Sequence, residues 1–118
     1  MKLYYFDIYG RAESARLILS HAKQPYENVY IKGEDLAALK SSGKAEFGQV
    51  PLLETEDGKF LSQSWSILRY LGRRFGYYPS DDAHTAWRID STIDAVEDYL
   101  TTYFRYNFEA DPERKKAA

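Results

Sequence analysis

The first third of the chain alternates short apolar runs with one amphipathic segment. Residues 2–6 are aromatic and apolar, as is typical of a β-strand, and Gly10 interrupts them. Within residues 11–24, apolar positions recur along one helical face: Ala15, Ile18, Leu19 and Ala22. Pro25 ends this helix, and residues 26–31 again have the composition of a strand. This order predicts a βαβ unit with parallel strands.

The next pattern predicts a hairpin followed by a helix. Residues 32–46 are polar and predict a loop with one helical turn near residues 35–40. Two apolar runs, 50–54 and 59–61, are joined by the sequence Thr-Glu-Asp-Gly, which favours a β-hairpin. Ser64 can cap a helix whose apolar face consists of Ile67, Leu68, Leu71 and Phe75. The predicted order is therefore βαβ followed by ββα.

The pattern changes after residue 76. Residues 77–82 (YYPSDD) have the composition of a linker, and residues 83–107 predict one long amphipathic helix. Pro112 stands where the first residue of a further helix is expected. A long helix and a helix start cannot bury their apolar faces alone. We therefore predict an unfinished second unit, completed by a partner chain or by further sequence.

Composition narrows the possible functions. The chain has 118 residues, of which 44% are hydrophobic, so it can form one core and is not disordered. Its net charge of −2 gives no electrostatic reason to expect nucleic acid. No apolar run approaches the ~20 residues of a membrane span, and the first ten residues lack the apolar core of a signal peptide.

The absence of cysteine limits the chemistry further. It excludes disulfides, cysteine-ligated zinc and a cysteine nucleophile, so sulfur chemistry would need the sulfur of a ligand. The two histidines, His21 and His84, are far apart in sequence without a metal-binding spacing. They are interpreted as residues on helix surfaces, and no metal site is expected.

Two local features point to a ligand. Pro51 interrupts a strand-like run, and a cis Val50–Pro51 bond would turn the backbone groups of Val50 outward to pair with a peptide-like ligand. The alternative is a trans proline at an edge strand or bulge. Gln63 and Ser64 begin the next helix, where an anion is favoured, although Ser64 could act only as an N-cap. Together they favour a groove for a small peptide that carries a carboxylate.

Three stretches in order carry a family resemblance: KLYYFDIYGRAESARLIL, FGQVPLLE and LSQSWSILRYLGRRFG. They resemble the cytosolic glutathione transferases, most closely the sigma class, which includes glutathione-dependent prostaglandin D synthase. The resemblance implies an α/β, thioredoxin-like, glutathione-binding domain with a cis proline over residues 1–79. Residues 80–118 would begin an all-α domain. It also implies a cytoplasmic homodimer acting in detoxification, without metal, nucleic acid or membrane.

The resemblance assigns catalytic roles to two residues. Tyr5 aligns with a tyrosine whose hydroxyl donates a hydrogen bond to the sulfur of glutathione and favours the thiolate. The alternative is that Tyr5 is only an aromatic residue of the core; Tyr4 lies on the opposite face of the strand. Arg11 aligns with an arginine that supports the active-site loop.

The resemblance places seven further positions at bound glutathione: Lys40, Gln49, Val50, Pro51, Gln63, Ser64 and Asp98. Val50 would bind the cysteinyl backbone, and the pair Gln63 and Ser64 would hold the γ-glutamyl carboxylate. Lys40 would reach the glycyl carboxylate. Asp98 would reach the glutathione of the other subunit. Gln49 stands where the family often has lysine.

The implied activity is attack of the glutathione thiolate on a small hydrophobic electrophile. A glutathione-dependent isomerase would use the same thiolate, so the sequence does not separate the two. A non-catalytic glutathione-binding or scaffold module is the third alternative, which the retained Tyr5 disfavours and the short chain favours. A thiol-disulfide oxidoreductase of the usual kind is excluded, because the chain has no Cys-x-x-Cys.

Overall fold

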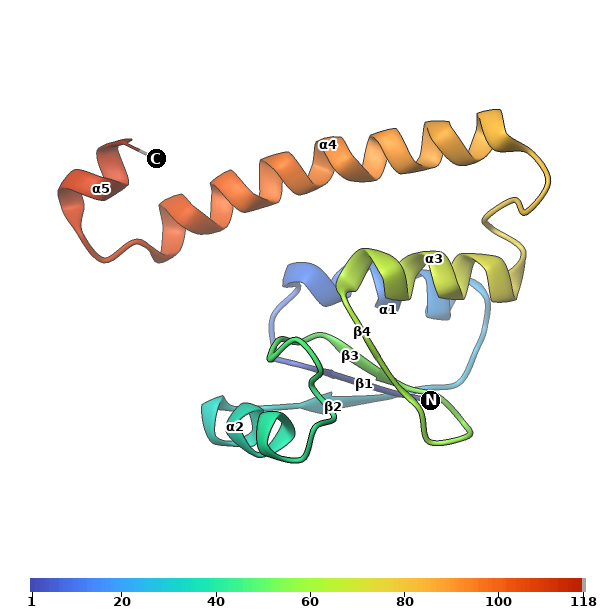
Figure 1. Cartoon of the computed structure of the whole chain (residues 1–118), viewed down its shortest axis with the longest axis horizontal. Coiled ribbons are helices and arrows are strands. Elements are labelled where there is room, and N and C mark those ends of the chain that lie inside the picture. Colours follow the sequence, from blue (N-terminus) through green and yellow to red (C-terminus); the bar gives the residue numbers. More distant parts are fainter. Residues whose placement is uncertain (118) are drawn as a thin grey trace. The chain divides into compact units, whose positions relative to one another are not determined.

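The computed structural model of the chain describes residues 1–117 and divides into two compact units, Met1–Tyr78 and a second unit that begins at Pro79 (Figure 1). The first unit holds a four-stranded mixed sheet in the order β2-β1-β3-β4. Strands β1 and β2 are parallel, whereas β3 is antiparallel to both β1 and β4. The predicted βαβ and hairpin arrangement is therefore confirmed. The strands are β1 Lys2–Tyr5, β2 Glu27–Tyr30, β3 Leu52–Glu54 and β4 Phe60–Ser62.

The helices of the first unit differ from prediction in two places. The segment predicted as one helix begins with a 3₁₀ turn and becomes α-helical only at Glu13. The segment predicted as a loop with one turn forms a nine-residue helix instead. Its start is held by the Asp35 carboxylate, which accepts a hydrogen bond from the Lys32 N–H at 2.7 Å. The elements are η1 Gly10–Ala12, α1 Glu13–His21, α2 Gly33–Ser41 and α3 Ser64–Phe75.

One face of the sheet carries the core. Helices α1 and α3 lie together over this face (Figure 1). The alternation of β1 directs Leu3 and Tyr5 into it, and each is at most 6% exposed. The fully or nearly fully buried residues that form the core cluster are Leu3, Tyr5, Ala12, Ala15, Leu19, Leu53, Ile67 and Leu71.

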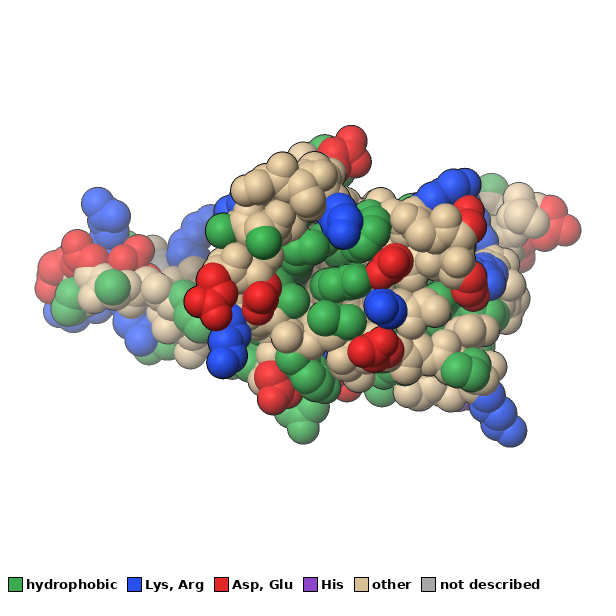
Figure 2. All heavy atoms as spheres, turned by 90° about the horizontal axis from the view of Figure 1, so that it is seen from below, with side chains coloured by type: hydrophobic (Ala, Val, Ile, Leu, Met, Phe, Trp, Pro, Cys, Tyr) green, Lys and Arg blue, Asp and Glu red, His purple; other side chains and the backbone are tan. Residues whose placement is uncertain are grey.

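The other face of the sheet is partly polar. Figure 2 views the molecule from this side and shows hydrophobic side chains gathered in a hollow, with acidic and basic side chains beside them. Tyr4 lies on this face, and its hydroxyl donates a hydrogen bond to the Glu54 carboxylate at 2.6 Å. Burial and the contact with Glu54 raise the pKa of Tyr4 to about 12. The alternation of β1 thus separates Tyr4 from Tyr5, as predicted.

The hairpin is tied to the end of α3. The Arg74 guanidinium donates two hydrogen bonds, of 2.7 and 2.8 Å, to the carboxylate of Glu56 in the hairpin turn. This pairing lowers the pKa of Glu56 from 4.5 to about 2.

The second unit contains a long helix, α4 Ala83–Phe108, and a short one, α5 Pro112–Ala117. Asp82 caps α4 by accepting a hydrogen bond from the Thr85 N–H at 3.1 Å. Both predicted helices are confirmed, including Pro112 at the first position of its helix. Exposed aromatic side chains lie along α4: Trp87, Tyr99, Tyr103, Tyr106 and Phe108. Within residues 1–117, no helix combines the length and the apolar composition that crossing a bilayer requires.

Candidate functional site

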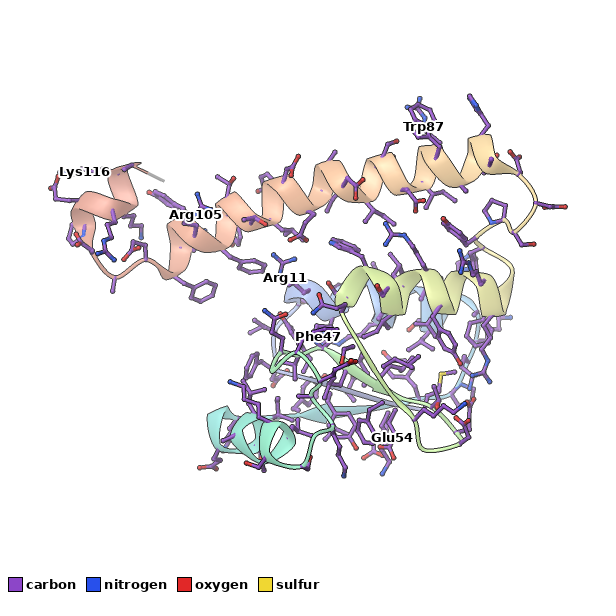
Figure 3. All side chains as sticks on the ribbon, in the orientation of Figure 1. Arg11, Phe47, Glu54, Trp87, Arg105 and Lys116 are labelled. Carbon is purple, nitrogen blue, oxygen red and sulfur yellow. The ribbon has the colours of Figure 1, made fainter. Side chains whose placement is uncertain are left out.

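Four segments meet at one end of the first unit: the end of β1, η1, the loop that leads into β3, and the first turn of α3 (Figure 1). This arrangement follows from the topology, because β1 runs toward this end and α3 begins there. Figure 3 labels Arg11 of η1 on the side of the sheet that carries α1 and α3, and Glu54 on the other side. Eight of the nine predicted site residues belong to the first unit.

Tyr5, a predicted site residue, is also a residue of the core. Its ring belongs to the core cluster, and its hydroxyl oxygen accepts a hydrogen bond from the Arg11 backbone N–H at 3.0 Å. Because the oxygen is the acceptor in this contact, the hydroxyl proton remains available for a second partner. The two alternatives weighed for Tyr5 are therefore compatible with each other.

The backbone beside the hydroxyl has to be glycine. Gly10 has φ +43°, and a Cβ at this position would lie 2.5 Å from the Tyr5 hydroxyl and 2.8 Å from the nearest ring carbon. A side chain would therefore be both strained and in collision with Tyr5. Gly10 was predicted only to interrupt a strand; its close approach to Tyr5 is seen only in the structure.

The loop that leads into β3 carries Pro51. The Val50–Pro51 peptide bond is cis, which confirms the prediction of a cis proline in the domain. Pro51 is buried and Val50 half-buried. The strand begins two residues later than predicted, at Leu52, because Pro51 has no N–H to give to the ladder.

The start of α3 corrects one expectation. Gln63, not Ser64, is the N-cap residue, and its side chain makes no capping hydrogen bond. The interpretation of Ser64 as only an N-cap is therefore wrong, since Ser64 is the first residue of the helix. A helix N-terminus presents backbone N–H groups and a partial positive charge, both of which favour an anion.

Gln63 also has an unusual backbone conformation. Its φ of +72° lies in a region that non-glycine residues rarely adopt, at a cost of about 1–3 kcal/mol. Its side-chain amide nitrogen donates a hydrogen bond to the side-chain oxygen Oε1 of Gln49 at 3.1 Å. This contact joins the loop before β3 to the start of α3, so two predicted site residues are brought together.

Two predicted residues remain, Lys40 of the first unit and Asp98 of the second. Lys40 is exposed in the last turn of α2, and its side chain passes Gly48, where a Cβ would lie 3.4 Å from the Lys40 Cε. Lys40 therefore lies beside the loop that carries Gln49. Asp98 is an exposed residue of α4 in the second unit, and its contact with glutathione stays a prediction.

Arg16 was not predicted as a site residue. It lies in α1, directly after the buried Ala15, and donates hydrogen bonds to the loop between β1 and η1. The only signal in the sequence for a role of Arg16 was its position at the edge of the apolar face of the helix. An arginine at such a position is ordinarily solvated.

The described part of the chain contains no group of three or more side chains from His, Cys, Asp and Glu placed to hold a metal ion. The cluster itself offers hydrogen-bonding groups: one tyrosine hydroxyl, two side-chain amides and a helix N-terminus.

Comparisons with known proteins show similarity in both sequence and fold. Residues 1–73 match the family described as "Glutathione S-transferase, N-terminal domain". "Glutathione S-transferase 1" of Ascaris suum is 46% identical over 99 residues, which cover 84% of this chain and 46% of that protein.

Two solved structures are also similar. The prostaglandin synthase D of Nilaparvata lugens has a TM-score of 0.83 at 35% identity, covering 98% of this chain and 56% of that chain. A Nu-class transferase from Haemonchus contortus has a TM-score of 0.75 at 41% identity, covering 89% and 50%. The chain spans about half the length of these relatives. The match over residues 1–73, together with the mixed sheet and the cis proline, means that this chain belongs to the glutathione S-transferase family.

Proposed function

We propose that this chain binds glutathione and supplies the thiolate-activating half of a glutathione transferase. The observation that carries the proposal is the geometry of Tyr5. Its hydroxyl lies at the end of β1, accepts the Arg11 N–H at 3.0 Å and keeps its own proton available. Arg11 supports the same loop through its backbone. Both residues keep the catalytic roles that the family resemblance implies.

The tripeptide would lie across the segments that surround Tyr5. The γ-glutamyl carboxylate would accept hydrogen bonds from Ser64 and from the first turn of α3, with Gln63 beside it. The cysteinyl backbone would pair with Val50, ahead of Pro51. The glycyl carboxylate would lie toward Lys40 and Gln49. Supporting this placement, Gln63 and Gln49 are in contact, and Lys40 passes the loop that carries Gln49.

The reaction follows from the acidity of the thiol. A free thiol has a pKa of about 8.5 and is mostly protonated at neutral pH. A hydrogen bond from the Tyr5 hydroxyl to the sulfur stabilises the thiolate anion and lowers the pKa of the thiol. Each unit by which this pKa falls corresponds to about 1.4 kcal/mol of stabilisation of the anion. The thiolate then forms a carbon–sulfur bond with a small hydrophobic electrophile. The proton of the thiol passes to solvent when the thiolate forms. In a substitution, the electron pair of the broken bond leaves with the departing group; in an addition, the electron pair of the double bond moves to the neighbouring atom, which takes up a proton.

The finer assignments are also proposals. The family resemblance supports a sigma-like enzyme that acts in detoxification as a cytoplasmic homodimer. In that dimer, Asp98 of one subunit would reach the glutathione bound by the other. We propose residues 1–79 as the glutathione-binding domain and residues 80–118 as the start of the all-α domain.

A glutathione-dependent isomerase is the second candidate. It is favoured by the similarity to a structure named prostaglandin synthase D. Both candidates require the Tyr5-stabilised thiolate, and they differ in whether the sulfur stays on the product. Mass analysis of the product therefore separates them: a transferase adds the mass of glutathione, and an isomerase leaves the substrate mass unchanged.

Calorimetric titration tests the proposal. We expect saturable binding of glutathione by the folded chain, and binding of S-methylglutathione that lacks the pH dependence caused by thiol ionisation. Absence of binding by a chain shown to be folded by circular dichroism would refute the proposal. The chain would then retain the family fold without forming its site, as in a non-catalytic module.

A further inference from the structure

The position of the Tyr5 hydroxyl depends on the loop between β1 and η1. This loop comprises residues 6–9, and the elements on either side of it meet through the hydrogen bond from the Arg11 N–H to the Tyr5 hydroxyl. A Cβ at Gly10 would approach this hydroxyl to 2.5 Å, so the backbone of Gly10 already lies close against the ring. The position of the hydroxyl therefore depends on the course of the loop.

Arg16 is the side chain that holds this loop. Its Nη1 donates to the backbone carbonyl of Ile8 at 2.8 Å and to that of Tyr9 at 3.2 Å. The Nη2 approaches the Phe6 carbonyl at 3.5 Å, the limit of a hydrogen bond. These contacts give hydrogen-bond partners to backbone carbonyl groups of a short irregular segment. The hydrogen bonds between the strands of the sheet cannot reach these carbonyl groups.

One side-chain amide and one carboxylate orient the guanidinium group of Arg16. The Arg16 Nε donates to the Asn28 side-chain oxygen on β2 at 3.1 Å, and Nη1 pairs with the Glu13 carboxylate at 2.9 Å. The guanidinium also lies 5.8 Å from the centre of the Tyr5 ring. The side chain is only 11% exposed. Such a planar fork with five N–H donors can serve several acceptors at once, which a lysine cannot do.

We propose that Arg16 is a positioning residue, which sets the place of the Tyr5 hydroxyl by fixing the backbone of residues 6–9. It does not touch the sulfur of glutathione; it acts through the loop and the Tyr5 ring. The expected effect of Arg16 on the thiolate rests on the proposed function. The effect of Arg16 on the loop can be measured without any ligand.

The test compares the whole chain carrying Arg16→Gln or Arg16→Lys with a control, Arg74→Gln. Arg74 also makes a double hydrogen bond to a carboxylate, but at the hairpin, and its side chain is 36% exposed. The first measurement is amide hydrogen exchange without ligand. In Arg16→Gln we expect the Arg11 amide to exchange at least about tenfold faster, while core amides such as that of Leu19 change less.

The second measurement is the thiolate absorbance of bound glutathione as a function of pH. We expect Arg16→Gln to raise the pKa of the bound thiol by about one unit, which is a tenfold lower ratio of thiolate to thiol at a given pH. The dissociation constant of glutathione should change less than about threefold, since the binding segments are elsewhere. Arg16→Lys, which keeps the charge without the fork, should fall between this variant and the unmodified chain. Arg74→Gln should match the unmodified chain.

The outcomes separate this inference from the proposed function. If a folded Arg16→Gln chain keeps the exchange rate of the Arg11 amide, the inference is refuted; an equal increase at all core amides refutes it too, since Arg16 would then only stabilise the fold. If the unmodified chain binds no glutathione, the proposed function fails, and the exchange rates alone decide the role of Arg16. If Arg16→Gln does not fold, the same comparisons are made with Arg16→Lys.

Discussion

The contact between Gly10 and Tyr5 leads to a quantitative prediction for the substitution Gly10→Ala. The new Cβ would meet the Tyr5 hydroxyl at 2.5 Å and two ring carbons at 2.8 and 3.1 Å, whereas ordinary contact begins at 3.4 Å. Tyr5 as a whole is only 6% exposed and belongs to the core cluster, so its ring cannot turn away freely. The hydroxyl must therefore move by roughly 1 Å, a displacement that removes most of a hydrogen bond.

Two costs add in this variant. An alanine at φ +43° costs about 1–2 kcal/mol because of its Cβ. The collision with a packed ring adds about 1–3 kcal/mol, as for other over-packed sites. Gly58→Ala is the matched control, because Gly58 has φ +79° and no atom within 4 Å of the position of its Cβ. Replacing glycine by alanine lowers the conformational entropy of the unfolded chain and so stabilises both variants by a similar amount. This contribution cancels when their free energies of unfolding are compared.

Urea unfolding of both variants measures the difference. We expect Gly10→Ala to lose about 1–3 kcal/mol more than Gly58→Ala. With glutathione bound, the thiol pKa should rise by about one unit in Gly10→Ala alone, because the displaced hydroxyl no longer reaches the sulfur. Equal free energies of unfolding in the two variants would show that the backbone of Gly10 is not pressed against Tyr5.

Three further predictions concern single side chains. Tyr5→Phe should leave glutathione affinity nearly intact and raise the pKa of the bound thiol; an unchanged thiolate titration would remove Tyr5 from the mechanism. Ser64→Ala should weaken glutathione binding by roughly 1–3 kcal/mol, and an unchanged dissociation constant in calorimetry would contradict the carboxylate contact. Glu56→Gln tests the pairing with Arg74, which lowers the pKa of Glu56 from 4.5 to about 2 in the folded chain. The contribution of Glu56 to stability is thus complete above pH 4.5 and is lost as the pH falls toward 2, so unmodified and variant chains should converge in acid urea titrations. A difference that stays constant over this range would argue against the pair.

The sequence by itself determined the order and type of most elements. Periods of two and of 3.6 residues are local properties, so β1, α1, α3 and α4 could be recognised from the spacing of their apolar residues. Pro51, Gln63 and Ser64 also stood out locally; the structure confirmed the cis bond, and it moved the N-cap of α3 from Ser64 to Gln63. Helix α2 escaped recognition at its full length because none of its residues is buried, so no apolar face marks it.

The tertiary structure decided how these residues work together. The contact of Gln63 with Gln49, 14 residues away, and the approach of Gly10 to Tyr5 depend on where the sheet and helices place their ends. Arg16 is the clearest case. In the sequence it is one arginine beside a helical face, whereas the packed chain brings it against carbonyls of a loop that begins ten residues earlier. A periodic pattern of apolar residues predicts which face of a helix or strand is buried. Which buried polar groups then need a hydrogen-bond partner depends on the course of the folded backbone.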